Sequence, residues 1–257
     1  MYSDNPINMR TGYITVALLA LMIAGCAELR QIAGQFESPR PLTNQEVVDG
    51  LKQALTIGAD SAASRLAATD GYYRDQAVRI LLPPEAEIIT DNLSLIPGGD
   101  KLVEDLILRI NRAAENAARE AAPVFASAVR NMTIQDGFAI LRGENDAATT
   151  YLRSATWDEL YGLYQPRIRT SIDRPVAGNM SASESWDVLT GQWNRLASSA
   201  VGRMSDLQTV DTQLDRYLTE RALDGLFLKL AEQEEIIRTN PAARVTDLLR
   251  RVFGQQG

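Results

Sequence analysis

The chain has 257 residues, 45% of them hydrophobic, so it can bury a substantial core and is not intrinsically disordered over most of its length. Its 26 basic and 33 acidic residues give a formal net charge of −7, which disfavours nucleic acid as a partner. The sequence has no histidine and one cysteine, which excludes a Ser-His-Asp triad, a Cys-His pair and an internal disulfide. We therefore expect a protein that is not an enzyme and binds neither a metal nor a cofactor.

The single cysteine follows an apolar run from Ile14 to Ala24. A short apolar segment that ends in small residues is typical of a signal peptide. The sequence Ile23-Ala24-Gly25-Cys26 matches a lipobox, in which the peptide is cut between Gly25 and Cys26 and the Cys26 thiol carries the lipid. Each buried CH₂ contributes about 0.8 kcal/mol, so an anchor of several acyl chains holds a protein to a membrane almost permanently. We expect residues 1–25 to be a lipoprotein signal peptide.

A transmembrane helix and an ordinary secretory signal are the alternatives to this lipobox. A membrane-spanning helix needs about 20 apolar residues, whereas this run is shorter and Glu28 and Arg30 follow it closely. Ala27 stands where an aspartate would favour retention at the inner membrane. We therefore expect a lipid-anchored protein in the cell envelope, on the periplasmic face of the outer membrane. Residues 26–42, which include Gly34, Ser38, Pro39 and Pro41, should form a flexible tether after the lipid.

Residues 43–254 have hydrophobic residues at helical spacing and no sustained alternation, which predicts one compact all-α domain of several helices. Pro123 should kink a long helix, and Ala197–Val210 is expected to be a loop. The helix starts that we predict are, in chain order, the capping box Thr43–Glu46, Pro83-Pro84, the turn Pro97–Asp100, Thr133, Asn145 or Asp146, a second capping box Thr156–Glu159, Ser183, Asp211 and Asn240-Pro241.

Several charged residues are candidates for a ligand site or for ion pairs: Arg109, Arg112, Glu115, Asp146 and Asp224. Arg109, Arg112 and Glu115 are spaced by three residues and share one face of a helix. A buried Arg-Glu pair could bind a carboxylate or phosphate, although a structural ion pair is the favoured interpretation. Asp146 precedes a helix whose free amides could hold an anion, although a helix cap is favoured there. Asp224 lies near several glutamates, which a solvated helix face explains best.

Aromatic residues form a second candidate site. Trp157, Tyr161 and Tyr164 share one helix face, and Trp186 and Trp193 lie seven residues apart on another. Such side chains could line a groove for an acyl chain or a peptide. Packing in the core is the commoner role for aromatic residues at helical spacing.

Several short motifs carry a family resemblance. They are Leu82-Pro83-Pro84-Glu85, Asn111-Arg112-Ala113-Ala114-Glu115, Ile140-Leu141-Arg142-Gly143, Asp146-Ala147-Ala148-Thr149, Ala222-Leu223-Asp224-Gly225-Leu226-Phe227 and Asn240-Pro241-Ala242-Ala243-Arg244. Over Leu42–Gly254 the chain resembles the bacterial lipoprotein family catalogued as domain of unknown function 4197. The resemblance implies a helical envelope protein without an assigned activity.

Two functions remain open from the sequence. The first is a non-catalytic outer-membrane lipoprotein whose helical domain binds another envelope protein or maintains the envelope. The alternative is a carrier or sensor of an amphiphilic small molecule, with Arg112 and the aromatic residues forming its pocket. A closed apolar cavity would favour the carrier, and a flat polar surface would count against it.

Overall fold

The computed structural model describes residues 41–92, 98–174, 180–210 and 213–254. The chain separates into two units, Met1–Thr43 and Asn44–Gly257, and the helices described below belong to the second. The described residues form helices and no strand, so the all-α prediction is confirmed. Gly25, Cys26 and nearly all of the predicted tether lie outside the described residues. No helix in the described part of the chain is long and apolar enough to cross a membrane.

The first helix of the second unit, α2 (Asn44–Ala67), begins where the sequence predicts it. It packs against α5, α10 and α11. Gly50 allows the close approach of α11 (Asp247–Gly254), because a Cβ at this position would lie 2.7 Å from Val252 Cγ2. The buried residues of α2 recur every three or four positions and include Val48, Leu51, Leu55, Ala59, Ala62 and Leu66.

Two helices follow each other along the middle of the chain, α4 (Gly99–Ala117) and α5 (Ala121–Asn131). A 3-10 turn, Ala118–Glu120, separates them. Pro123 has no N–H, and its ring would clash with the carbonyl four residues earlier in a regular helix. The interruption predicted at this proline is therefore present just before it. The short helix predicted at Pro83-Pro84 is also found, as the 3-10 turn Pro84–Ala86 and α3 (Glu87–Thr90).

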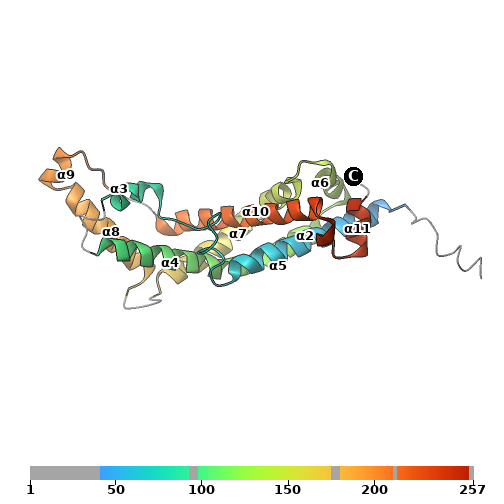
Figure 1. The fold of residues 1–257 in the computed structure, drawn as a ribbon, viewed down its shortest axis with the longest axis horizontal. Helices are drawn as coiled ribbons and strands as arrows, with labels where there is room; N and C mark the ends of the chain where they lie inside the picture. Colours follow the sequence, from blue (N-terminus) through green and yellow to red (C-terminus); the bar gives the residue numbers. More distant parts are fainter. Residues whose placement is uncertain (1–40, 93–97, 175–179, 211–212, 255–257) are drawn as a thin grey trace, which may run out of the picture. The chain divides into compact units, whose positions relative to one another are not determined.

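The longest helices of the domain are α7 (Ala147–Ile172) and α10 (Leu214–Thr239), of 26 residues each. They run side by side, and α7 also packs against α4 and α5 (Figure 1). The Phe227 ring of α10 meets Phe125 of α5 edge to face at 5.7 Å and stacks on Trp157 of α7 at 5.9 Å. These contacts place the centre of the hydrophobic core between α5, α7 and α10.

The second capping box, Thr156–Glu159, was predicted to start a helix, and this prediction is wrong. Thr156 lies inside α7 and is buried, and its hydroxyl donates to the Leu152 carbonyl at 2.7 Å. The helix continues because its buried residues form an unbroken stripe with a spacing of four. These are Ala148, Leu152, Thr156, Leu160, Tyr164, Ile168 and Ile172. A local capping motif does not end a helix whose apolar face is covered on both sides of the motif.

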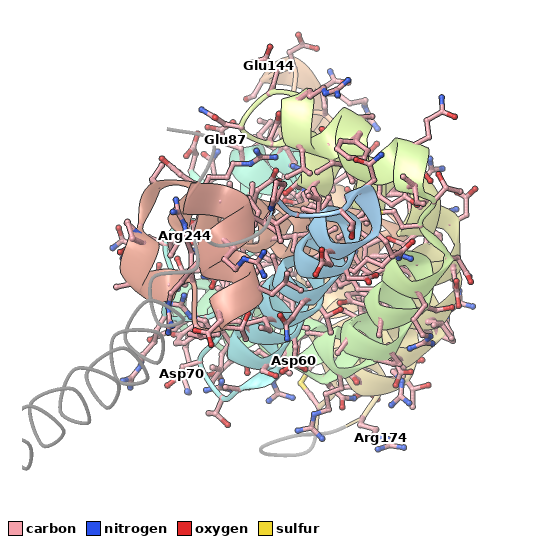
Figure 2. The ribbon with its side chains drawn as sticks, turned by 90° about the vertical axis from the view of Figure 1, so that its right-hand side faces the viewer. Asp60, Asp70, Glu87, Glu144, Arg174 and Arg244 are labelled. Atoms are coloured by element: carbon pink, nitrogen blue, oxygen red, sulfur yellow. The ribbon has the colours of Figure 1, made fainter. Side chains whose placement is uncertain are left out.

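The remaining short helices correct the sequence prediction at two places. Ala197–Val210 is not all loop, because Ala200–Met204 forms α9, capped by the Ser199 hydroxyl. At Asn240 the chain forms only a 3-10 turn, Pro241–Ala243, and α11 starts later. The helices α6 (Ile134–Arg142) and α8 (Ala182–Ala197) both begin with complete capping boxes. Charged side chains lie around the edge of the bundle in end view, as Glu87, Glu144 and Arg244 do in Figure 2.

A buried glutamate joins α7 to α10. Asp146 occupies the N-cap position of α7, but its side chain does not cap the helix. The carboxylate of Glu234 from α10 accepts hydrogen bonds from the amides of Ala148 and Thr149 at 3.0 and 2.8 Å. The Thr149 hydroxyl donates to the same carboxylate at 2.8 Å, and Arg238 pairs with it at 2.7 Å. The favoured prediction of a cap by the Asp146 side chain is therefore wrong, and the protein itself supplies the anion that the free amides could hold.

Replacing this glutamate should destabilise the domain. Glu234→Ala leaves two buried amides without an acceptor and a half-buried Arg238 without its partner, so we expect a loss of about 3 kcal/mol in the free energy of unfolding. Urea denaturation followed by circular dichroism measures it. The control is Glu235→Ala, an exposed residue of the same helix, for which the change should stay within about 0.5 kcal/mol. Equal effects of the two substitutions would contradict the capping role.

Candidate functional site

The connection from α2 to the turn at Pro84, residues 68–83, crosses α4 and α10 and is the least regular part of the core. Asp70 has φ +68°, in the left-handed region that few residues other than glycine adopt. At Gly71 a Cβ would lie 2.3 Å from the Arg65 carbonyl oxygen, so the chain can turn here only with glycine. Such backbone conformations persist where the surrounding contacts enforce them. We call residues 68–83 the crossing loop.

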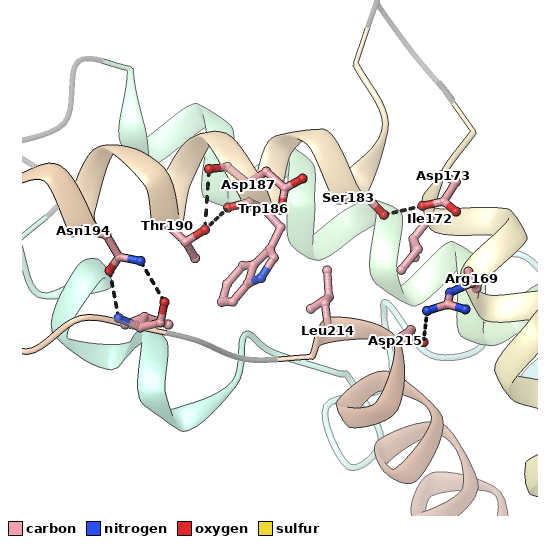
Figure 3. Close-up of a pocket in the computed structure, with 11 residues that line it drawn as sticks. Arg169, Ile172, Asp173, Ser183, Trp186, Asp187, Thr190, Asn194, Leu214 and Asp215 are labelled. Carbon is pink, nitrogen blue, oxygen red and sulfur yellow. Dashed lines mark hydrogen bonds and ion pairs between the residues drawn. The ribbon is translucent and has the colours of Figure 1, made fainter.

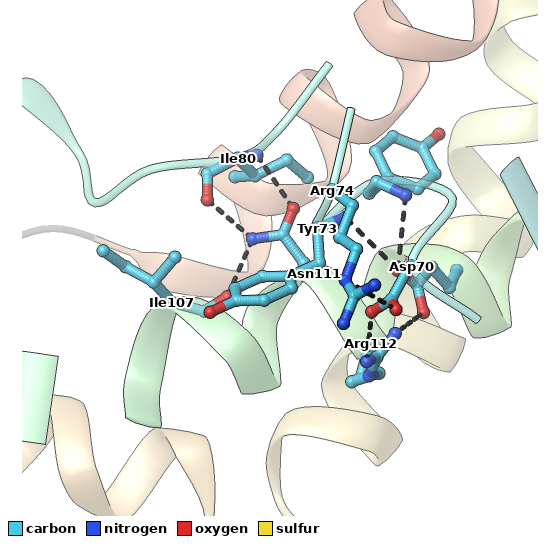
Figure 4. Close-up of polar contacts among 9 residues, drawn as sticks. Asp70, Tyr73, Arg74, Ile80, Ile107, Asn111 and Arg112 are labelled. Carbon is cyan, nitrogen blue, oxygen red and sulfur yellow. Dashed lines mark hydrogen bonds and ion pairs between the residues drawn. The ribbon is translucent and has the colours of Figure 1, made fainter. Parts of the chain in front are cut away.

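A charged network from α4 holds the first part of the crossing loop (Figure 4). Arg112 donates to Asp70 Oδ1 at 2.6 Å and to Glu115 Oε2 at 2.7 Å. Glu115 is buried, and its other oxygen accepts the amides of Tyr72 and Tyr73 at 3.3 Å each. Burial alone would lower the pKa of Arg112, but its bonds to Glu115 and Asp70 raise that pKa above the ordinary value. Arg112 therefore stays charged and joins α4 to the loop.

An asparagine holds the second part of the loop. The buried Asn111 side chain accepts the Ile80 amide at 2.9 Å and donates to the Ile80 carbonyl at 2.8 Å (Figure 4). It also donates to the Ile107 carbonyl of its own helix at 2.7 Å. Asn111 thus pairs with Ile80 as a neighbouring strand would. Ile80 and Leu82 are buried, whereas Leu81 between them is 56% exposed, the alternation of an extended segment.

A groove of about 300 Å³ lies where this extended segment meets α10. We call it the Leu81 groove. Leu81 and Leu228, which is 43% exposed, form its apolar part together with Tyr217. Asp224 also lines it and is paired with Arg221 at 2.9 Å and with Arg153 of α7 at 2.6 Å. The groove therefore combines exposed leucines with a fixed set of paired charges.

A charged pocket of about 390 Å³ lies on another side of the crossing loop. Lys229 of α10 is buried there, with its ammonium 2.7 Å from Asp75 Oδ2 and 2.9 Å from Glu232 Oε1. Burial alone would lower the pKa of Lys229, but the hydrogen bonds to these carboxylates raise it. A protonated ammonium is not a nucleophile. Lys229 is therefore placed to hold the crossing loop on α10, and it is not placed to act as a nucleophile.

The charged residues singled out from the sequence do not form one site. Arg112, Glu115 and Asp224 all border the crossing loop. Arg109 instead donates to the backbone carbonyl of Met180, before α8. Asp146 is exposed at the start of α7. The shared helix face therefore does not bring Arg109 into the network of Arg112.

The aromatic residues are also separated. Tyr164 and Trp193 are fully buried, and Tyr161 is half-buried. Trp157 packs against Phe227 and against the guanidinium of Arg153, whose Cζ is 4.5 Å from the Trp157 ring centroid. Trp186 lines a separate pocket beside α8. The predicted aromatic groove is not formed as one surface, because most of these rings pack in the core.

Several key residues were not singled out from the sequence. Asp70, Asn111 and Lys229 all fix the crossing loop, and Glu234 was noted only as one of several glutamates. A signal existed for Asn111, because it is a polar position within the alanine-rich stripe of α4. A polar residue at a buried position needs a partner. No comparable signal marks Asp70, which lies in a loop.

A comparison with family models shows to which protein family the chain belongs. The model described as "Protein of unknown function (DUF4197)" matches residues 41–254. The chain belongs to this family. No curated protein and no solved structure matches the chain. Membership of this family confirms the resemblance seen in the sequence, and its description assigns no activity.

Removing the guanidinium of Arg112 should lower stability. Arg112→Ala breaks two charge-assisted hydrogen bonds, but the side chain is partly exposed, so we expect a loss of about 1–2 kcal/mol. That corresponds to a decrease of about 4 °C in Tm, measured by thermal denaturation. Arg119→Ala, at an exposed position two turns further along, is the control and should leave Tm unchanged. An unchanged Tm for Arg112→Ala would point to a ligand role for this arginine.

Proposed function

We propose that this member of the family is a lipoprotein, anchored to the outer membrane through Cys26. The proposal is supported by the apolar run Ile14–Ala24 that leads to Gly25-Cys26, and by the absence of any other cysteine in the sequence. The tether, residues 26–42, would let the helical domain reach partners in the periplasm. At about 3.3 Å per residue it could extend to about 50 Å.

The helical domain, in this proposal, binds an extended segment of another envelope protein in the Leu81 groove. The observation that carries it is an exposed leucine on a backbone that Asn111 holds in place. The Leu81 amide and carbonyl have no hydrogen-bond partner among the described residues. An extended peptide could pair with them and place an apolar side chain between Leu81 and Leu228. Because the segment is already ordered, little conformational entropy is lost on binding.

The alternative, a carrier of an amphiphile, has less support. A lipid carrier needs an enclosed apolar cavity of several hundred Å³. The apolar cavity beside Leu51, Ala148 and Phe253 holds only about 20 Å³, room for about one water molecule. An acyl chain does not fit there. We therefore favour a partner-binding domain without catalytic activity.

Removing the thiol of Cys26 tests the proposed membrane localisation. Cys26→Ala should move the protein from the membrane fraction to the soluble periplasmic fraction, because the lipid is its attachment in this proposal. Fractionation of a Gram-negative host with immunodetection measures the shift, and the circular dichroism spectrum of the released protein should match that of the wild type. A Cys26→Ala protein that stays in the membrane fraction would refute the lipobox interpretation.

Photo-crosslinking tests the groove. A photoreactive residue placed at Leu81 should give one covalent adduct of defined mass with an envelope protein in intact cells. The control position is Val245, which is 59% exposed and outside the groove. Leu228→Asp should abolish the Leu81 adduct, because it places a charge in the apolar part of the groove, whereas Ile134→Asp on α6 should not. The same adduct at Val245, or its persistence with Leu228→Asp, would contradict the proposal.

A further inference from the structure

The Leu81 groove has a charged side that the proposed function leaves unexplained. Arg79 lies two residues before Leu81 and lines the same groove. Its neighbours Val78 and Ile80 are buried, whereas Arg79 itself is exposed. Residues two apart in an extended segment point to the same side, about 7 Å from each other. Arg79 and Leu81 therefore face outward together.

The guanidinium of Arg79 is held in place but is not neutralised. Its Cζ lies over the Tyr73 ring, 4.7 Å from the ring centroid. The Tyr73 amide is bonded to the buried Glu115 carboxylate at 3.3 Å, so the ring extends from a fixed part of the crossing loop. No carboxylate pairs with Arg79 among the residues that the structure describes. An arginine held over a ring keeps its charge for a carboxylate that comes from another molecule.

Positive charge prevails around this groove. Asp224 is the one acidic residue in its described lining, and Arg221 and Arg153 already share it, at 2.9 and 2.6 Å. Arg79 adds a third guanidinium without adding a carboxylate. The balance is opposite in the pocket beside α8, where three aspartates line the wall together with Arg169 (Figure 3). The chain as a whole has a net charge of −7, so this groove attracts an acidic segment that the molecule in general repels.

We infer that the partner segment in the Leu81 groove carries an acidic side chain two positions away from its apolar anchor, and that Arg79 selects it. This inference rests on the proposed function, because it names the chemistry of the segment proposed to bind there. When the segment pairs with the Leu81 backbone, its apolar anchor lies opposite Leu81. The residue opposite Arg79 is then two positions away, whether the strands run parallel or antiparallel. A carboxylate there meets the guanidinium, whereas a lysine or arginine meets a like charge.

Three labelled peptides test the acidic position. Each is a short β-forming peptide with one central leucine, and the residues two positions before and after the leucine are both Glu, both Gln or both Lys. Fluorescence anisotropy with the full-length protein in detergent measures the Kd of each. The Glu peptide should bind about fivefold more tightly than the Gln peptide, and the Lys peptide should bind most weakly. High salt should reduce the difference between the peptides, because it screens exposed charges.

Two charge-reversal variants assign the preference to one arginine. Arg79→Glu should reverse the order, so that the Lys peptide binds most tightly. The matched control is Arg119→Glu, at an exposed position of the 3-10 turn between α4 and α5 and outside the groove. It makes the same change in net charge and should keep the order of the wild type. The circular dichroism spectra of both variants should match that of the wild type.

The outcomes distinguish this inference from the proposed function. If the three peptides bind equally, or if Arg79→Glu keeps the preference for Glu, the inference is overturned. The proposed function stands in either case if Leu228→Asp abolishes the binding of all three peptides. Where no peptide binds, the photo-adduct at Leu81 in cells decides. Its loss with Arg79→Glu but not with Arg119→Glu supports the inference, its persistence with Arg79→Glu overturns it, and the absence of any adduct overturns the proposed function as well.

Discussion

The buried carboxylate of Glu234 is the interaction on which the arrangement of the long helices depends. The first amides of a helix have no partner within it, and the helix dipole favours a negative charge beside them. Glu234 meets both requirements of α7 from a position 85 residues later in the chain. Arg238 neutralises the buried charge and also donates to the Ile140 carbonyl at 3.2 Å, near the end of α6. One ion pair thus sets the relative positions of α6, α7 and α10.

The same principle recurs at the crossing loop. Asn111 and Glu115 are buried helix residues whose side chains satisfy backbone groups of a loop that has no partner strand. Buried backbone amides must be bonded, so these two residues allow an irregular segment to lie inside a helical domain. The exposed position of Leu81 follows from this, because fixing Ile80 inward directs its neighbour outward. The candidate binding surface is therefore a consequence of core polar contacts.

Much of the fold could be predicted from the sequence, because helical periodicity and the prolines act locally. The pair of Arg112 with Glu115 was predictable for the same reason, since residues three apart meet on a helix. The continuity of α7 through Thr156 could not be predicted, because the apolar stripe favours one long helix whereas the capping motif favours a new helix start. Only packing decides between them. The contacts of Glu234 with Thr149 and of Arg112 with Asp70 join distant segments, and no local pattern encodes them.

The contact between Glu234 and the start of α7 also bears on the order of events during synthesis. Chains are made from the N-terminus, and domains tend to fold as their segments become available. The acceptor for the first amides of α7 is made 85 residues after they are, close to the end of the domain. Until then α7 lacks its cap and its contacts with α10, although α4 and α5, which are made earlier, can already pack against it. The domain can therefore complete its fold only when almost the whole chain has emerged.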